Sequence, residues 1–475
     1  MGRRGGARRK KLGKPSAGLL ACIAEVHLCE CGAYLIDLMG FVEFEGRRLS
    51  SRLRIDGSII ELECIFEDVE QLINPLRRID VAIFKGSHKL FALSDLIHRT
   101  TSGRPGLGAA SIYVSTIAVE DYSPDGADIA VSESWIVRIS SWHMISRSSG
   151  IERAFERDAN NRRVGIWRFA QPLDWAVRTS DGRLSATTIS NIVEGGIHAN
   201  SLTLDIVDSI RVHFSDLVGF REAIKEVHKI RLFGSLLFGK ALNLEFFAVE
   251  AKEDGEYRTQ HQVFGIKQIS EAGLPARPLI GAAQREIIPK YFENFFSIYE
   301  QISEAISIHF LVSQELGFDP STRLQMLCQA LESIHRNLVP TSSAPLDLAT
   351  LDGILASHGY GGELREKLVN QARHAHEPNL RQRLKYYFAK FEHEIRIVWP
   401  DIRKKSTINE IVDARNYFAH RSPRIGRPGG ARLWNNVELT KAIVQLALLD
   451  AIGVDTTGLG QRMATERFAK FAIDR

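Results

Sequence analysis

The sequence predicts an α+β protein of several domains, in which a β-rich N-terminal region precedes an all-α helical bundle. Between about residues 32 and 208, alternating or β-branched runs end at Gly, Asp, Ser or Pro, as strands do. From about residue 285 onward, apolar residues instead recur at intervals of three and four, which is typical of amphipathic helices. At 475 residues the chain is also too long for one compact core.

These observations divide the chain into three predicted segments: a basic arm over 1–18, a β-rich domain over 19–275 and a helical bundle over 285–475. The first fourteen residues hold seven Lys and Arg. Glu25 and His27 interrupt the apolar segment that follows, which argues against a signal peptide. The arm is either a solvated terminus or a contact for an acidic partner. Within the β-rich domain, helical spacing appears between Ser215 and Leu237, and strand spacing returns at 241–251.

Composition narrows the functional class only moderately. Hydrophobic content of 44% and charged content of 25% are ordinary for a globular protein, and a formal net charge of +4 does not by itself indicate nucleic acid. No run of eighteen apolar residues appears, so no membrane partner is expected and we place the protein in the cytoplasm. The cysteines are too scattered for a disulfide scaffold and fit a reducing compartment. They are Cys22, Cys29, Cys31, Cys64 and Cys328.

Five helices are predicted in the bundle, over 287–318, 321–338, 379–399, 407–420 and 434–454. In the fourth, Thr407 and Glu410 have the spacing of a capping box, so the helix is expected to begin there. Arg415 lies on its apolar stripe. The stripe comprises Ile408, Ile411, Val412, Arg415, Phe418 and Ala419. A guanidinium at such a position needs an anion or polar partners, which hints at function.

His420 lies in the last turn of the same helix, before Pro423. It is about 140° around the helix from Arg415 but one turn beyond Asn416, whose amide could orient the imidazole. A histidine near its switching pH and a fixed cation are what phosphodiester cleavage requires. The spacing alone is weak evidence, because Arg138 and His143 share it inside a strand-rich segment.

Arg415-Asn416-Tyr417-Phe418-Ala419-His420 resembles the R-N-x-x-x-H signature of HEPN domains. Residues 323–337 resemble the helix that precedes the catalytic helix in ApeA-like HEPN proteins, and the order of β-rich region and helical domain is similar to that of ApeA, an abortive-infection protein. The resemblance implies a metal-independent, cofactor-free endoribonuclease that works as a homodimer, with a composite active site at the two-fold interface. It also implies antiviral defence, with the N-terminal region sensing a phage-derived trigger or restraining the nuclease.

By the same resemblance His420 would act as general base or general acid, Arg415 would stabilise the phosphate, and Asn416 would position His420 or the RNA. The products would be 2′,3′-cyclic phosphate and 5′-hydroxyl ends. Basic residues around the motif helix provide candidate RNA-backbone contacts, although a solvated basic surface is the alternative. These residues are Lys404, Lys405, Arg421 and Arg424.

Other motifs are weaker. Residues 234–241 nearly match a phosphate-binding loop, but Ala241 replaces its Ser or Thr, so the segment is expected to be core. His27, Cys29 and Cys31 lack a second ligand pair, so no metal site is predicted. The rival to the nuclease is a non-catalytic dimerisation or RNA-binding scaffold with a β-rich ligand-binding module. In that scaffold Arg415 would form a structural ion pair at an interface.

Overall fold

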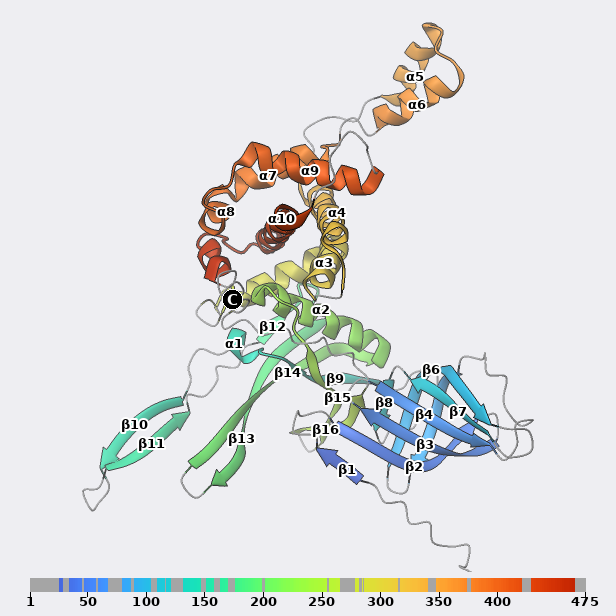
Figure 1. Ribbon diagram of the computed structural model, residues 1–475. Coiled ribbons are helices and arrows are strands. Elements are labelled where there is room, and N and C mark those ends of the chain that lie inside the picture. The colour runs from blue at the N-terminus through green and yellow to red at the C-terminus, as the bar shows by residue number, and fades with distance from the viewer. Residues whose placement is uncertain are drawn as a thin grey trace, which may run out of the picture. The chain divides into compact units, whose positions relative to one another are not determined.

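Figure 1 shows the computed structural model of the chain. The structure describes residues 25–28, 34–44, 47–56, 59–66, 79–86, 89–103, 109–115, 117–120, 131–146, 151–157, 163–169, 176–198, 201–253, 256–264, 278–281, 284, 286–314, 317–340, 347–373, 377–420 and 429–465. The predicted basic arm and the Cys22, Cys29 and Cys31 thiols lie outside these residues.

The first of two compact units comprises Met1–Ala130 and Gln260–Ile266. Six of its strands form a closed antiparallel ring in the order β2-β3-β4-β7-β6-β5, because β5 pairs with both β6 and β2. A further strand, β8, pairs with β6 and with β16. The strands are β1 (Glu25–Leu28), β2 (Tyr34–Phe44), β3 (Arg47–Asp56), β4 (Ile59–Phe66), β5 (Ile79–Gly86), β6 (Leu90–Gly103), β7 (Ala109–Ser115), β8 (Ile117–Glu120) and β16 (Glu256–Phe264).

Strict alternation in the sequence explains the interior of this ring. In β4 every second side chain is buried, from Ile60 to Phe66, as expected for a strand with one face on a core. Phe84 of β5 and Phe91 of β6 are completely buried in the same cluster. Gly40 of β2 is required where β2 meets β5, because a Cβ atom there would lie 2.2 Å from the Lys85 carbonyl oxygen.

The second unit comprises Val131–Thr259 and Lys267–Arg475. Its sheet has the antiparallel order β15-β9-β14-β13-β12. A separate two-stranded ribbon is formed by β10 and β11. The elements are β9 (Val131–Ile139), α1 (His143–Ser146), β10 (Ile151–Arg157), β11 (Arg163–Phe169), β12 (Ala176–Arg178), β13 (Leu184–His198), β14 (Ser201–Gly219), α2 (Phe220–Phe238) and β15 (Leu244–Glu253).

Helix α2 joins this sheet to the helical bundle. Phe220 and Phe247 pack around Trp135 of β9, with ring centroids 6.1 Å and 4.9 Å from that of Trp135. At the other end of α2, the Gln445 side chain of α10 donates a hydrogen bond of 2.8 Å to the Leu236 carbonyl oxygen. Because α2 packs on both, the sheet and the bundle form one compact unit, and contacts do not divide the chain at the predicted 275–285 boundary.

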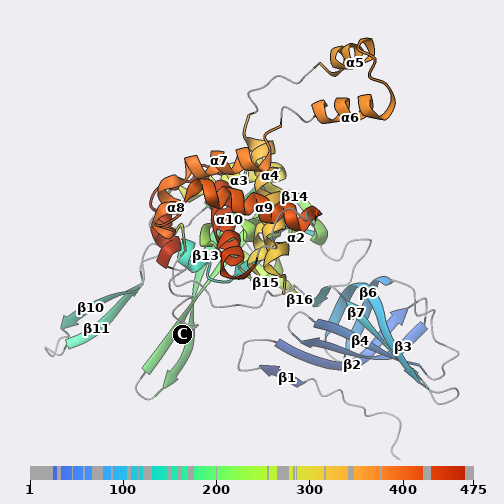
Figure 2. The same ribbon diagram turned by 45° about the horizontal axis from the view of Figure 1, so that its top comes forward.

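The bundle is built around α10, which has thirteen buried residues and contacts α3, α4, α7, α8 and α9 (Figures 1 and 2). The helices are α3 (Ile288–Ser313), α4 (Pro320–Leu338), α5 (Leu348–Ser357), α6 (Gly362–Arg373), α7 (Leu380–Lys390), α8 (Glu392–Val398), α9 (Lys404–His420) and α10 (Gly430–Ala451). An N-terminal antiparallel β region thus precedes a helical region, and the predicted α+β class is confirmed.

Several helices differ in detail from the prediction. The helix predicted over 379–399 is two helices, α7 and α8, which meet at Phe391. No helix was predicted between 339 and 379, yet α5 and α6 form a hairpin there. The segment 234–241 comprises the last turn of α2 and the three residues after it, and its Leu236, Leu237 and Phe238 are completely buried, as expected for core.

Candidate functional site

Helix α9 carries the Arg415 and His420 motif. It begins at Lys404, one turn before the predicted capping box at Thr407 and Glu410, and it ends at His420. Its buried residues hold it against α4, α7 and α10, and they are Ile408, Ile411, Val412 and Ala414. The apolar stripe weakens toward the C-terminal end, where Phe418 is half-buried and Ala419 is exposed. The outer turns of α9 are therefore only partly covered by the chain's own core.

Arg415 is half-buried, with 32% of its side chain exposed. Its Nη2 atom lies 3.9 Å from Glu332 Oε1 on α4, and its Nη1 atom donates a hydrogen bond of 3.3 Å to Asn416 Oδ1. Both contacts are long for a guanidinium, whose strong pairs lie at about 2.7–2.9 Å. Arg415 is therefore oriented by the protein but not firmly bonded within it.

Cys328 of α4 is a buried neighbour of Arg415 and Glu332. Burial raises the pKa of the Cys328 thiol to about 12, and the Glu332 carboxylate raises it further while the Arg415 guanidinium opposes the shift. The thiol thus stays neutral and is a small apolar neighbour of the Arg415–Glu332 pair.

Asn416 and His420 do not form the hydrogen bond that the sequence suggested. The Asn416 side-chain oxygen accepts from Arg415 instead. His420 is exposed at the end of α9 and makes no hydrogen bond or ion pair with any residue that the structure describes. Within one chain, no bond among the described residues links His420 to Arg415, as the angular separation along the helix implied.

A second arginine, Arg383 of α7, lies behind Glu332 and is only 3% exposed. Its Nη1 donates to the Glu332 carbonyl oxygen at 2.6 Å, and its Nε donates to the Pro378 carbonyl oxygen at 2.6 Å. Glu377 Oε2 lies 3.7 Å from both Arg383 Nη2 and Arg336 Nε. Burial lowers the pKa of Arg383, and the Glu332 carboxylate opposes that shift. The Arg383 guanidinium thus links α7 to α4 at Glu332, the residue whose carboxylate approaches Arg415.

Sequence reasoning missed Arg383, although the signal was present. The apolar residues of α7 recur as Leu380, Leu384, Tyr387 and Phe388, and Arg383 falls on this stripe as Arg415 does on that of α9. His335 of α4 lies nearby, with its ring centroid 5.3 Å from Tyr386 and 5.9 Å from Tyr387. Burial, reinforced by Arg383, lowers the pKa of His335. The imidazole is therefore neutral at pH 7.

Residues 326–457 match the family model described as Apea-like HEPN. The helical region contains an ApeA-like HEPN domain. The match spans the C-terminal part of α4 and all of α5 to α10, and so includes Glu332, Arg383, Arg415 and His420. No curated protein and no solved structure matched the chain. HEPN domains are generally ribonucleases, and they typically bind RNA and dimerise.

The predicted basic contacts of the HEPN domain are only partly described. Lys404 Nζ lies 3.5 Å from Glu392 Oε2, and Lys405 is exposed. Arg421 and Arg424 lie outside the described residues. Arg381 of α7 adds a basic group that the sequence analysis did not single out, and it donates to Asn409 Oδ1 of α9 and lies 4.0 Å from Asp413 Oδ1.

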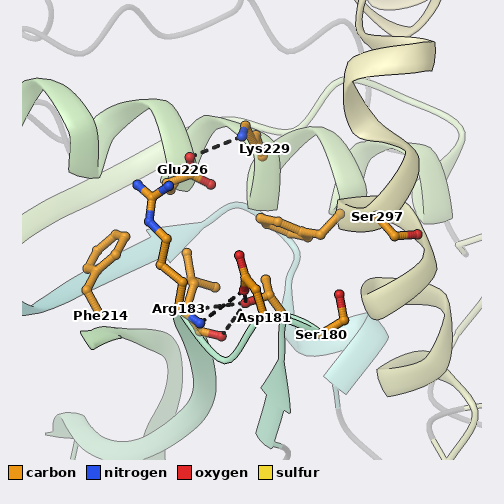
Figure 3. Close-up of a pocket in the computed structure, with 10 residues that line it drawn as sticks. Ser180, Asp181, Arg183, Phe214, Glu226, Lys229 and Ser297 are labelled. Carbon is orange, nitrogen blue, oxygen red and sulfur yellow. Dashed lines mark hydrogen bonds and ion pairs between the residues drawn. The ribbon is translucent and has the colours of Figure 1, made fainter. Parts of the chain in front are cut away.

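A separate cavity of about 210 Å³ lies between the β12–β13 turn, α2 and α3, away from the residues of α9 (Figure 3). Figure 3 shows Lys229 directed toward Glu226, at 3.1 Å. Arg183, also in its wall, pairs with Glu222. The basic groups of this cavity are therefore matched by carboxylates of α2, as in a structural ion-pair cluster.

Among the residues that the structure describes, no helix is long and apolar enough to cross a membrane. The His, Cys, Asp and Glu side chains in that part of the chain form no group of three or more that could hold a metal ion.

Proposed function

We propose that this protein is a metal-independent HEPN endoribonuclease that acts in antiviral defence by abortive infection. The HEPN domain would cut RNA in the cytoplasm, and the β-rich N-terminal region would sense a phage-derived trigger or restrain the nuclease. The proposal is supported by the HEPN family match over 326–457 and by the placement of Arg415 and His420 on one helix within it.

The chemistry needs a base, an acid and a cation near one phosphate. The base removes the proton of the ribose 2′-hydroxyl, and the 2′-oxygen then forms a bond to phosphorus. The bond from phosphorus to the 5′-oxygen breaks, and the acid gives that oxygen a proton. The products are a 2′,3′-cyclic phosphate and a 5′-hydroxyl. Arg415 would stabilise the added negative charge, and His420 would serve as base or acid.

A homodimer would complete this site. The His420 of one chain provides one proton-transfer group, whereas the reaction uses two. If two α9 helices face each other across a two-fold axis, the two copies of His420 can act as base and acid on the same phosphate. The exposure of Ala419 and His420 at the end of α9, and the partial exposure of Phe418, support such a contact.

The proposal depends chiefly on how weakly Arg415 is bonded within the chain. A guanidinium on an apolar stripe, held by a 3.9 Å ion pair and a 3.3 Å hydrogen bond, keeps donors free for an incoming phosphate. Asn416 orients Arg415, and this role replaces the contact with His420 suggested by the sequence. Lys404, Lys405, Arg421 and Arg424 would hold the RNA backbone on either side.

The proposal is tested by incubating the full chain with RNA in excess EDTA and analysing the product ends. We expect cyclic-phosphate ends, and we expect cleavage to fall at least about 100-fold in Arg415→Ala and in His420→Ala. Arg396→Ala and His393→Ala are matched controls on α8, with side chains 49% and 79% exposed, and should cleave as wild type. Cleavage that requires a divalent ion, or that survives both α9 substitutions, would refute the assignment.

One observation favours a second function, a non-catalytic RNA-binding or dimerisation scaffold. Arg415 forms an ion pair with Glu332 inside the chain, as such a scaffold would use it. The scaffold has no use for an imidazole at 420. RNA binding and dimerisation that are unchanged in His420→Ala, together with no cleavage by the wild type, would favour the scaffold.

A further inference from the structure

Trp434 of α10 exposes an aromatic ring at the surface of the helical bundle. It is 44% exposed, whereas Trp135 and Trp142 are at most 1% exposed. The first turns of α10 fix its position, because the neighbouring Leu433 and Val437 are buried and α10 packs on α4 (Figures 1 and 2). Trp434 therefore presents a planar apolar surface on a firmly packed helix.

Arg323 of α4 lies over the same ring. Its guanidinium carbon is 5.4 Å from the centre of the Trp434 ring, within the range of a cation–π contact. Its Nε atom donates a hydrogen bond of 2.9 Å to the Phe318 carbonyl oxygen, which orients the group. Its two Nη atoms make no hydrogen bond or ion pair with any residue that the structure describes. The acid nearest to it in the sequence, Asp319, accepts hydrogen bonds from backbone N–H groups of the first turn of α4.

The surroundings of Trp434 are polar and basic. Residues 421–434 contain four Arg and no Asp or Glu. The first acid of α10, Glu438, follows one turn after Trp434 and is half-buried. The exposed neighbours of the ring on α10 are Ala431, Arg432 and Asn435. Protein interfaces bury a continuous apolar core, which a single ring among such neighbours does not provide.

A nucleobase stacked on the indole fits this surface. Every base has a flat apolar face, and its phosphate carries the negative charge that Arg323 and Arg432 attract. A base inside a duplex is covered by its neighbours, so only an unpaired base can stack on a side chain. A lipid surface would need a row of apolar side chains along one face of a helix. The structure describes all of α10, and Trp434 is its only exposed large apolar side chain.

The ring lies within reach of RNA held at the proposed catalytic site. Helix α10 contacts α9, whose last residue is His420. The nine residues from His420 to Gly429 span at most about 30 Å. A strand of about nine stacked nucleotides, at about 3.4 Å each, covers that distance. One RNA strand can therefore contact both His420 and Trp434.

We propose that Trp434 stacks an unpaired base of the RNA and that Arg323 holds an adjacent phosphate, so that the two residues position the strand. Neither residue belongs to the Arg415–His420 motif, and Arg323 precedes residues 326–457, which match the family model. The inference rests on the proposed function, because RNA is the substrate of the site that these residues serve.

The first test measures binding of the full chain to single-stranded 2′-O-methyl RNA of about twelve nucleotides by fluorescence anisotropy. The blocked 2′-hydroxyl prevents cleavage, so the readout does not depend on catalysis. Trp434→Ala should raise the dissociation constant about fivefold or more, and Trp434→Phe should raise it less. Tyr360→Ala is a matched control, because Tyr360 is 45% exposed, and it should bind like the wild type. An unchanged dissociation constant in Trp434→Ala would overturn the proposal.

An oligonucleotide that keeps its phosphates but lacks its bases tests stacking directly. Wild-type binding should weaken when the bases are removed, and the loss should be at least about fivefold smaller in Trp434→Ala. A fully paired duplex should bind equally to both proteins. Equal losses in the two proteins on removal of the bases would overturn the proposal, because Trp434 would then act through the fold and not through a base.

Salt dependence tests the phosphate contact. Arg323→Gln should lower the slope of the logarithm of the dissociation constant against the logarithm of salt concentration by about 0.7, the value for one phosphate of a single strand. Trp434→Ala should leave that slope unchanged, because stacking releases no counterion. A wild-type slope in Arg323→Gln would refute the phosphate contact.

Cleavage assays separate this inference from the proposed function. In Trp434→Ala, KM should rise with the dissociation constant while kcat stays near that of the wild type. A wild type that cleaves no RNA but binds the 2′-O-methyl strand through Trp434 would refute the nuclease and support the stacking site. Cleavage that depends on Arg415, with unchanged binding and KM in Trp434→Ala, would do the reverse. Weaker self-association of Trp434→Ala with unchanged RNA affinity would show that the ring covers a protein surface, and would overturn the proposal.

Discussion

Two arginines on neighbouring helices occupy the same kind of position and differ in how they are held. Arg383 of α7 and Arg415 of α9 both interrupt an apolar stripe. Arg383 is 3% exposed and bonded to two carbonyl oxygens at 2.6 Å each. Arg415 is 32% exposed and has only a 3.9 Å ion pair and a 3.3 Å hydrogen bond.

The difference separates structural from functional use of a guanidinium. The partners of Arg383 are backbone carbonyl oxygens, which cannot move aside as a side chain can. Arg383 is therefore fixed, and it stabilises the packing of α7 on α4. The partners of Arg415 are side chains that can move aside, so a phosphate can replace them. Position on a stripe marks both residues as unusual, but the type of partner distinguishes their roles.

Removal of Arg383 should have the largest effect on stability. Arg383→Ala removes the side-chain donor from the Glu332 and Pro378 carbonyl oxygens and takes the nearby guanidinium from Glu377. Hydrogen bonds to charged groups contribute about 1.5–3 kcal/mol each, so we expect a loss of about 3 kcal/mol in the free energy of unfolding of the helical bundle. Urea unfolding followed by helical circular dichroism measures this loss. Arg396→Ala on α8 provides the control and should unfold like the wild type.

Removal of Arg415, unlike removal of Arg383, should affect RNA cleavage far more than stability. We expect Arg415→Ala to unfold within about 1 kcal/mol of the wild type, because it loses only long, partly solvated contacts. Cleavage, by contrast, should fall at least about 100-fold. Arg415→Lys keeps the charge but loses the fork of donors, so its cleavage should lie between those of wild type and Arg415→Ala. A stability loss in Arg415→Ala as large as that in Arg383→Ala would erase the distinction between the two residues.

Sequence alone predicted the order of the fold well, because periodicity reports which face of each element is buried. The alternation in 59–66 and the three-four spacing in 287–318 correspond to β4 and α3. The hairpin of α5 and α6 was missed because its glycines resemble a loop and its apolar residues pack on no core within the chain. Closure of the six-stranded ring was also beyond the sequence, since it depends on the distant pairing of β2 with β5.

The contacts of the candidate site were predicted less completely than the order of the fold. The periodicity of the sequence placed Arg415 on the apolar stripe of a helix, but it gave no measure of how far the side chain is buried. The partner of Asn416 was misjudged, because intervals along a helix do not tell which neighbour a side-chain amide prefers. The approach of Glu332 to Arg415 could not be read from the sequence, because it depends on how α4 packs on α9.

The stability of the folded chain should also depend on pH through His335, which lies near Arg383. The pKa of His335 is lowered in the folded chain by burial and by Arg383, so the unfolded chain binds a proton more readily. The stabilisation is complete above the unfolded pKa of about 6.5 and is lost as the pH falls below it, by at most about 1.4 kcal/mol per pH unit. His335→Gln should therefore lose less stability than the wild type between pH 7 and pH 5. Parallel curves for the two proteins would show that His335 titrates normally.

The smallest effect on stability and RNA binding is expected from a substitution of Glu332, which contacts both Arg383 and Arg415. Its carboxylate lies 3.9 Å from Arg415 Nη2, while its backbone carbonyl accepts from Arg383. Glu332→Gln removes the negative charge and keeps both the side-chain shape and the carbonyl, so stability should barely change. If the carboxylate competes with phosphate for Arg415, the variant should bind RNA a few-fold more tightly, with a lower KM and a nearly unchanged kcat. Weaker binding in Glu332→Gln would instead mean that the carboxylate holds Arg415 in its working orientation, and Arg415 would then be as structurally fixed as Arg383.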